Sequence, residues 1–225
     1  KIVILGAGIS GHTAAAHLRR KLGKEHEVLV VSPNRNYQWV PSNIWVGIGR
    51  MKSSQLIFPL EPLYKRKGIG YKQAKVVSFH PEGNKTEDKP FVSVEYVFGE
   101  KQGTQENVTY DYLINATGPK LAFDLTEGLI PGTNKVFSVC TYDHAEHAWH
   151  GLKDLIDQLK NTSQKAKILI GTGHAKATCQ GAAFEYILND GTESTLDVNG
   201  VFVAIGHDPR NELVKNTIDL DAGGY

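Results

Sequence analysis

A glycine-rich segment near the start of the chain has the residue types and spacing of a phosphate-binding turn. Residues 1–5 (KIVIL) form an apolar run typical of a buried strand, and residues 12–22 are rich in helix formers. Between them, residues 6–11 read GAGISG. In such a turn the first glycine allows a tight bend, the second leaves space for a pyrophosphate, and the third lets helix and strand pack closely. The predicted cofactor contacts here are Gly6, Ala7, Gly8, Ile9, Ser10 and Gly11.

The end of the second predicted strand, residues 27–32, departs from the usual NAD pattern. A dinucleotide-binding βαβ unit normally carries an acidic residue about 20 residues after the glycines, where it binds a ribose hydroxyl. Here the strand ends in Ser32, Pro33, Asn34 and Arg35, with no carboxylate. Ser32 and Asn34 can supply hydrogen bonds, and we expect Ser32 and Pro33 to contact the cofactor. The missing acid disfavours NAD and leaves FAD open.

Composition bounds the remaining possibilities. The chain has 225 residues, 40% of them hydrophobic and 22% charged, with a formal net charge of +1. This is the composition of a globular protein with one large or two small domains. The basic residues are scattered, so we expect no nucleic-acid partner. No apolar run approaches the ~18–20 residues of a membrane span and no signal peptide is visible, so we expect a cytoplasmic protein or one peripheral to the inner membrane face.

The two cysteines, Cys140 and Cys179, lie 39 residues apart without a CxxC pair or zinc-ligand spacing. Spacing alone favours two buried thiols in a reducing compartment. A helix is predicted over residues 143–160, and it places His144, His147 and His150 near one stripe. Solvent-exposed helix residues explain that stripe better than a zinc site, and we predict no metal.

The middle of the chain adds a β-rich insertion. Residues 35–66 are irregular and rich in aromatic residues, which can line a ring cofactor or pack as a loop; predicted contacts there are Pro41, Ser42 and Asn43. Residues 69–114 predict three antiparallel strands, a β-meander that contributes Val76 to the site. The last of these strands closes on Ala116, Thr117 and Gly118, small residues that leave room for a dinucleotide at the carboxyl edge of the sheet.

These features predict an α/β fold: a Rossmann-like doubly wound parallel sheet that binds FAD or NAD(P), with an inserted antiparallel β-meander. Residues 1–165 form the expected FAD-binding domain, with the meander at about 69–114. Residues 166–225 form an expected incomplete second dinucleotide-binding segment, because the span from Lys167 to Gly206 is only 40 residues long.

Several segments, taken in order, resemble sulfide:quinone oxidoreductases, flavoproteins of the two-dinucleotide-domain disulfide reductases. The resemblance covers about residues 1–187 and is carried by residues 3–8 (VILGAG), 37–43 (YQWVPSN), 116–121 (ATGPKL), 140–146 (CTYDHAE) and 178–186 (TCQGAAFEY). It implies that FAD takes electrons from sulfide through redox cysteines and passes them to a quinone. The matching positions are Cys140 and Cys179, with His144 as a nearby histidine and Glu185 as an acid–base carboxylate.

The resemblance changes the interpretation of the thiols and adds partners. A reactive thiol must be deprotonated near neutral pH, which a helix N-terminus or His144 can assist. Sulfide and quinone are the implied partners, and peripheral membrane contact is implied only through the family's C-terminal segment. Residues 189–225 instead resemble thioredoxin reductase. A composite FAD-binding scaffold without turnover and an NADPH-dependent disulfide reductase therefore remain alternatives.

Overall fold

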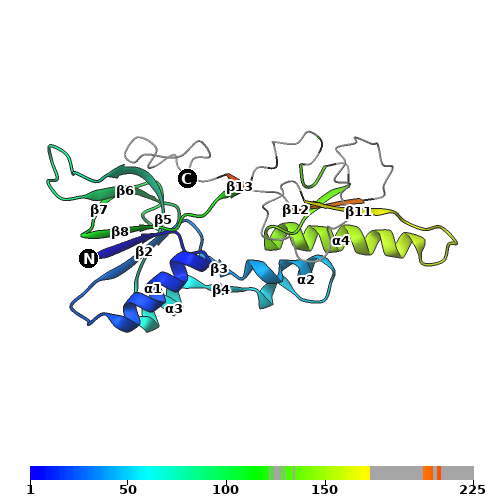
Figure 1. The fold of residues 1–225 in the computed structure, drawn as a ribbon, viewed down its shortest axis with the longest axis horizontal. Coiled ribbons are helices and arrows are strands. Elements are labelled where there is room, and N and C mark those ends of the chain that lie inside the picture. The colour runs from blue at the N-terminus through cyan, green and yellow to red at the C-terminus, as the bar shows by residue number, and fades with distance from the viewer. Residues whose placement is uncertain are drawn as a thin grey trace, which may run out of the picture. The chain divides into compact units, whose positions relative to one another are not determined.

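The computed structural model describes residues 1–121, 123, 128, 130–133, 135–172, 200–204 and 207–208. These residues group into two compact units (Figure 1), and each unit is considered by itself. The described part of the first unit is residues 1–37 and 58–119. The second contains residues 38–57 and the described residues between 120 and 208. The boundary expected near residue 165 stays a prediction.

A six-stranded sheet forms the centre of the first unit. Its strands lie in the order β7-β6-β5-β2-β1-β8. Strands β5, β2, β1 and β8 are parallel, whereas β5, β6 and β7 pair antiparallel. The strands are β1 (Ile2–Leu5), β2 (Val28–Ser32), β5 (Gly70–His80), β6 (Phe91–Tyr96), β7 (Gln105–Thr109) and β8 (Tyr112–Asn115). The predicted α/β fold with an inserted meander is confirmed.

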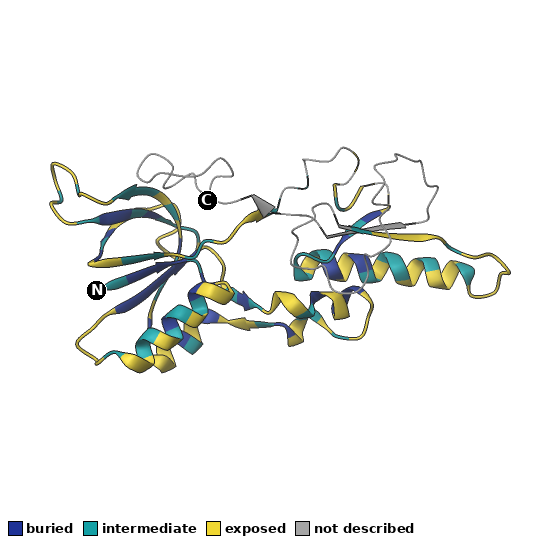
Figure 2. Ribbon diagram, viewed as in Figure 1, coloured by how far each residue is buried: buried dark blue, intermediate teal, exposed yellow. Residues whose placement is uncertain are grey.

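Alternating side chains give this sheet two apolar faces. Val3 and Leu5 face a core completed by the meander strands, including Val92 and Val94. Ile4, between them in sequence, faces a second core that contains Ala15, Leu60 and Tyr64. The central strands are accordingly buried on both sides (Figure 2), as expected for parallel strands.

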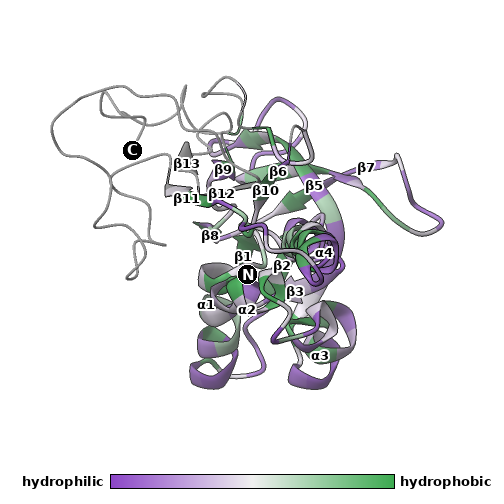
Figure 3. Ribbon diagram, turned by 90° about the vertical axis from the view of Figure 1, so that its right-hand side faces the viewer, coloured by the Kyte–Doolittle hydropathy of each residue, from purple (hydrophilic) through white to green (hydrophobic). Residues whose placement is uncertain are grey.

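Two helices cover the second core, α1 (Ile9–Lys21) and α3 (Leu60–Lys67). Their outer turns are hydrophilic and their inner faces meet the sheet (Figure 3). The expectation that residues 35–66 are irregular is wrong for α3. Pro59 is the N-cap of α3 and Pro62 lies in its first turn, where a missing backbone N–H costs nothing. Gly68 ends the helix with a φ of 67°.

The predicted third meander strand is in fact two strands. β7 pairs antiparallel with β6, and β8 then pairs parallel with β1. Between them Tyr110 is buried and the Asp111 N–H donates to the carbonyl of Lys1, at 2.9 Å. The chain therefore turns out of the meander and enters the parallel sheet within two residues. Strand β5 likewise belongs to both arrangements, because its first half pairs with β2 and its second half with β6.

The second unit contains short segments and one long helix. Parallel strands lie in the order β10-β12-β11, and α4 packs on β10 and α2. Val46, Leu56 and Ala145 form its buried core. The predicted helix over 143–160 is confirmed as α4. The sequence also predicts an alanine-rich helix that ends at Tyr186, and this segment lies outside the described residues. The elements are η1 (Val40–Ser42), α2 (Asn43–Gly47), η2 (Ser53–Gln55), β9 (Lys120–Leu121), β10 (Val136–Ser138), α4 (Tyr142–Leu159), β11 (Ile168–Thr172), β12 (Gly200–Ala204) and β13 (His207–Asp208). Two further short strands, β3 (Asn36–Gln38) and β4 (Ile57–Pro59), pair with each other.

No helix in the described part of the chain has the length and apolar character that crossing a bilayer requires.

Candidate functional site

Two of the three glycines in the first turn are required by close backbone packing. Gly6 has a φ of +96°, and a Cβ placed on it would lie 2.2 Å from the carbonyl oxygen of Ala116. A Cβ on Gly11 would lie 2.1 Å from the carbonyl oxygen of Gly6. The neighbours in both cases are main-chain atoms, which cannot rotate away. The tight bend and the close helix–strand contact expected from the sequence are therefore present.

Gly8 has a different environment. A Cβ on this residue would meet no atom within 4 Å, so the space beside it is open. Gly8 is also the N-cap of α1, whose first turn contains no acidic residue. Ile9 and Ser10 in that turn are exposed. An open space at the positive end of a helix matches the requirements of a bound pyrophosphate.

The carboxyl ends of the parallel strands bring further predicted residues to this turn. The Gly6 N–H donates to the Val31 carbonyl and the Ala116 N–H to the Leu5 carbonyl, both at 2.8 Å. After Ala116, the Thr117 hydroxyl donates to Asn115 Oδ1 at 2.9 Å, and Gly118 has a φ of +73°. Residues 116–118 therefore lie against the glycine turn at one edge of the sheet.

The loop after β2 is held by its neighbours on β5. Ser32 is buried, and its hydroxyl oxygen accepts the Asn34 N–H at 3.3 Å. The Tyr71 hydroxyl donates to the Asn34 carbonyl at 2.6 Å, and Gln73 Nε2 donates to the Pro33 carbonyl at 3.3 Å. Burial, followed by the charge of Glu61, raises the pKa of Tyr71 to about 12 and keeps it a donor. Sequence reasoning missed this clamp, because its acceptors are main-chain carbonyls of another segment.

Four other predicted contacts belong to other elements of the structure. Val76 packs against the meander core from β5. Pro41 is exposed in η1, Ser42 is half-buried, and Asn43 is buried at the start of α2. Asn43 Oδ1 accepts a hydrogen bond from Gln38 at 3.0 Å, whereas its buried Nδ2 has no partner among the described residues. An unpartnered buried amide is an available donor, and the cofactor contacts of these four residues stay predictions.

A histidine that sequence reasoning did not single out lies one residue after the turn. His12 Nδ1 is 3.2 Å from the Tyr64 hydroxyl, and its ring centroid is 4.9 Å from that of Tyr37. Burial lowers the pKa of His12, and the positive charge of Lys67 lowers it further. The neutral ring packs α1 against α3, and we assign it a structural role.

The predicted thiol site is described only in part. Cys140 is a half-buried free thiol two residues before α4, and its N–H donates to Ser138 Oγ at 3.1 Å. His144 lies in the first turn of α4, with its ring 5.4 Å from that of Phe123 and its buried Nδ1 unpartnered in the described part of the chain. No hydrogen bond joins Cys140 to His144 within these residues. Cys179 and Glu185 lie outside the described residues.

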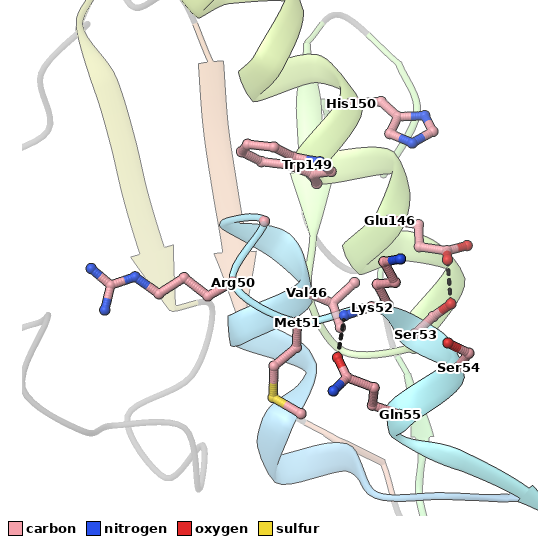
Figure 4. A pocket seen from close by; sticks show the side chains of 11 residues that line it. Val46, Arg50, Met51, Lys52, Ser53, Ser54, Gln55, Glu146, Trp149 and His150 are labelled. Carbon is pink, nitrogen blue, oxygen red and sulfur yellow. Dashed lines mark hydrogen bonds between the residues drawn. The ribbon is translucent and has the colours of Figure 1, made fainter.

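The second unit also has a polar hollow of about 540 Å³ between the η2 loop and α4 (Figure 4). The Ser53 hydroxyl donates to Glu146 across it, and the Lys52 N–H donates to Gln55 Oε1 at 2.9 Å. Trp149 closes one side, where a Cβ on Gly49 would lie 2.5 Å from the indole ring. No residue predicted to act in catalysis or cofactor binding lines this hollow.

Comparison with known proteins identifies the family. The family model for pyridine nucleotide-disulphide oxidoreductases matches residues 1–173, most of the chain. The chain belongs to this family. It is therefore an oxidoreductase domain of Rossmann-like fold from proteins that bind FAD or NAD(P), as the glycine turn indicates.

Individual relatives agree with the resemblance found in the sequence. Sulfide-quinone reductase from Aquifex aeolicus is 27% identical over 187 residues, which cover 83% of this chain and 37% of the relative. Thioredoxin reductase from Mycolicibacterium smegmatis is 69% identical over 35 residues, which cover 16% of this chain and 11% of the relative. The chain thus spans little more than a third of the first relative's length.

Solved structures share the fold. The sulfide:quinone oxidoreductase of Aquifex aeolicus superposes with a TM-score of 0.60 at 24% identity, covering 76% of this chain and 34% of that one. The reduced CoADR-RHD of Bacillus anthracis gives a TM-score of 0.66 at 18% identity, covering 99% of this chain and 47% of that one.

Proposed function

We propose that this chain is the FAD-binding part of a flavoprotein that oxidises sulfide and passes the electrons to a quinone. The observation that carries the cofactor assignment is the open space at Gly8, which lies at the start of α1 in a turn that packs against Ala116 through Gly6. The absence of an acidic residue at 32–35 weakens a plain NAD assignment and leaves FAD open. The 27% identity to a sulfide-quinone reductase supports the choice of substrate.

In this proposal the chain's own residues do the following work. The first turn of α1 binds the pyrophosphate through backbone N–H groups, and residues 116–118 leave room for the dinucleotide. The thiolates of Cys140 and Cys179 are the groups that react with sulfide. When an S–S bond forms between a thiolate and HS⁻, two electrons and one proton are released, and Glu185 accepts the proton. FAD, when bound, supplies the two-electron acceptor.

Flavin binding is tested first. Purified chain is titrated with FAD while flavin fluorescence and absorbance are recorded, and one flavin per chain is expected. Gly8→Val is expected to abolish binding, because a branched side chain occupies the pyrophosphate's space, yet to keep the fold, because nothing lies within 4 Å. Stoichiometric FAD binding by a folded Gly8→Val variant would contradict the assignment.

The sulfide half-reaction is tested next. With flavin bound and oxygen removed, sulfide is expected to bleach the flavin absorbance in a single turnover. Cys179→Ser and Cys140→Ser are expected to slow the bleaching by orders of magnitude, because each removes a nucleophile. If the wild type binds flavin but is not bleached, the chain is a non-catalytic scaffold.

The 35-residue match to thioredoxin reductase supports a second candidate, an NADPH-dependent disulfide reductase. Anaerobic mixing with NADPH separates the two. Rapid bleaching by NADPH favours the reductase, and bleaching by sulfide alone favours sulfide oxidation.

A further inference from the structure

The loop that follows β2 holds one arginine in place while leaving its hydrogen-bond donors free. The Arg35 guanidinium lies over the ring of Phe98, 5.6 Å from the ring centroid. No salt bridge or hydrogen bond engages this guanidinium within the described part of the chain. A cation–π contact uses the face of the guanidinium, so its in-plane N–H groups remain available to a ligand.

The backbone beneath this arginine is fixed from three sides. The Leu60 N–H donates to the Arg35 carbonyl at 3.0 Å. Tyr71 and Gln73 bind the carbonyls of the two residues before it. The Val97 N–H, next to Phe98, donates to the Gln73 carbonyl at 3.1 Å. These hydrogen bonds connect the loop after β2, strand β5 and the residues after β6 into one cluster, and this cluster holds the backbone of Arg35.

The position of this cluster in the βαβ unit indicates which part of a bound dinucleotide would lie next to it. The Gly6 N–H bonds the carbonyl of Val31, one residue before the end of β2, so the cluster lies one strand away from the pyrophosphate turn. In a βαβ unit this is where the ribose of the adenosine lies. A carboxylate there binds the 2′-hydroxyl, whereas an arginine accommodates a 2′-phosphate.

Two of the neighbouring lysines are engaged in ion pairs, and a third, Lys101, lies over the ring of Tyr96. Lys72 is paired with Glu106, and Lys75 is paired with Glu95. Glu61 acts on Tyr71 through its charge, but it lies outside salt-bridge distance of Arg35. In the 32–35 segment, a dianionic group on the ribose would meet the planar guanidinium of Arg35 and no carboxylate.

We propose that Arg35, supported by Phe98, forms a 2′-phosphate subsite, so that the first nucleotide site also accepts 2′-phosphorylated adenine nucleotides. The inference rests on the dinucleotide site itself and not on FAD being its occupant. Charge-assisted hydrogen bonds from an arginine make the expected preference for a 2′-phosphate about tenfold to hundredfold.

Calorimetric titration of the full chain with three small probes tests the subsite. The probes are adenosine 2′,5′-bisphosphate, its 3′,5′ isomer of equal charge, and AMP. The 2′,5′ isomer is expected to bind at least about tenfold tighter than AMP and clearly tighter than the 3′,5′ isomer. Equal affinity for the two isomers would indicate a merely basic surface and would overturn the proposal.

Variants assign the effect to the arginine. Arg35→Gln is expected to lower affinity for the 2′,5′ isomer about tenfold while AMP binding is unchanged. Arg66→Gln, which removes an exposed arginine from the last turn of α3, is the charge-matched control and is expected to change neither. Asn34→Asp adds a carboxylate beside the subsite and is expected to reduce the preference. A preference that persists in Arg35→Gln overturns the assignment.

FAD titration of the same samples separates the two proposals. If FAD binds and the 2′-phosphate preference is missing, only the subsite is wrong. If the preference is present and FAD does not bind, the subsite stands and the FAD assignment fails.

Discussion

The ammonium group of Lys72 donates to both carboxylate oxygens of Glu106, at 2.9 and 3.0 Å. The pair joins β5 to β7 across β6, and the Tyr96 hydroxyl on β6 also bonds both partners. Burial acts to raise the pKa of Glu106, but hydrogen bonds from Tyr96 and Lys72 outweigh it, and the pKa is lowered. The three strands of the meander thus share one polar cluster.

Removing this lysine is expected to destabilise the meander. Lys72→Met leaves Glu106 without its cation, and because Glu106 is 37% exposed the loss is reduced by solvent to about 1 kcal/mol. Lys75→Met, on the same strand, breaks a pair whose lysine is 51% exposed and is the matched control with a smaller effect. Urea unfolding followed by circular dichroism measures both. Equal losses would show that burial does not distinguish the pairs.

The same pair gives a pH dependence of known sign. A carboxyl group with a lowered pKa in the folded state contributes stability above its ordinary pKa of 4.5. That stability is lost as the pH falls through the lower, folded value. Unfolding of wild type and Glu106→Gln between pH 7 and pH 3 is expected to converge at the acid end. A constant difference across this range would exclude the linkage.

The glycine turn predicts opposite outcomes for two alanine substitutions. Gly11→Ala is expected to destabilise the first unit by several kcal/mol, because its Cβ collides with the Gly6 carbonyl. Gly8→Ala is expected to leave stability within about 0.5 kcal/mol, because the space is open and its φ of −71° suits any residue. Thermal unfolding of the two variants checks this. A large loss in Gly8→Ala would mean that the open space is filled in solution.

His12 predicts a second pH effect, near neutrality. Its pKa is lowered in the folded state, so the unfolded chain binds the proton more readily. Stability is therefore expected to fall as the pH drops below the ordinary histidine value of 6.5. His12→Phe keeps the aromatic contact and is expected to flatten this dependence between pH 7 and 5. Parallel curves for wild type and His12→Phe would refute the assignment.

Ser138 is expected to hold the main chain of the thiol. Ser138→Ala removes the acceptor of the Cys140 N–H in a buried position, which costs about 1 kcal/mol. It is also expected to change the rate at which Cys140 is alkylated by iodoacetamide, measured by peptide mass spectrometry. Ser163→Ala, on an exposed loop, is the control and is expected to change neither quantity. An unaltered melting temperature in Ser138→Ala would remove this role.

The parts of the fold set by local pattern were predictable from the sequence. The glycine turn, the apolar strands and the amphipathic helix α4 each follow from spacing along a short segment. Helix α3 was missed because Pro59 and Pro62 read as breaks, although proline suits the first turn of a helix. The junction at Tyr110 was missed because residues 108–116 (VTYDYLINA) contain no glycine or proline that would mark a break between two strands.

The candidate site was predictable only where one residue's type determines its role. The roles of Gly6 and Gly11 were predictable, since a side chain at either position would collide with main-chain atoms. The clamp formed by Tyr71 and Gln73 depends on which loop carbonyls lie opposite β5, and that follows from strand register. The Arg35–Phe98 contact joins residues that are 63 positions apart in the sequence. It too depends on how distant segments pair, so it could not be predicted from either residue alone.

The contact between Gly6 and Ala116 has a consequence for how the protein acquires its site. Strand β8, which carries Ala116 against the turn, pairs with a strand more than one hundred residues earlier in the chain. Pairing over such a separation is slow, whereas the β5-β6-β7 meander closes through short connections. We therefore expect the turn to reach its final geometry after the meander has folded and β8 has paired with β1. A nascent chain released before residue 116 contains all three glycines of the turn and still lacks the wall against which Gly6 must pack.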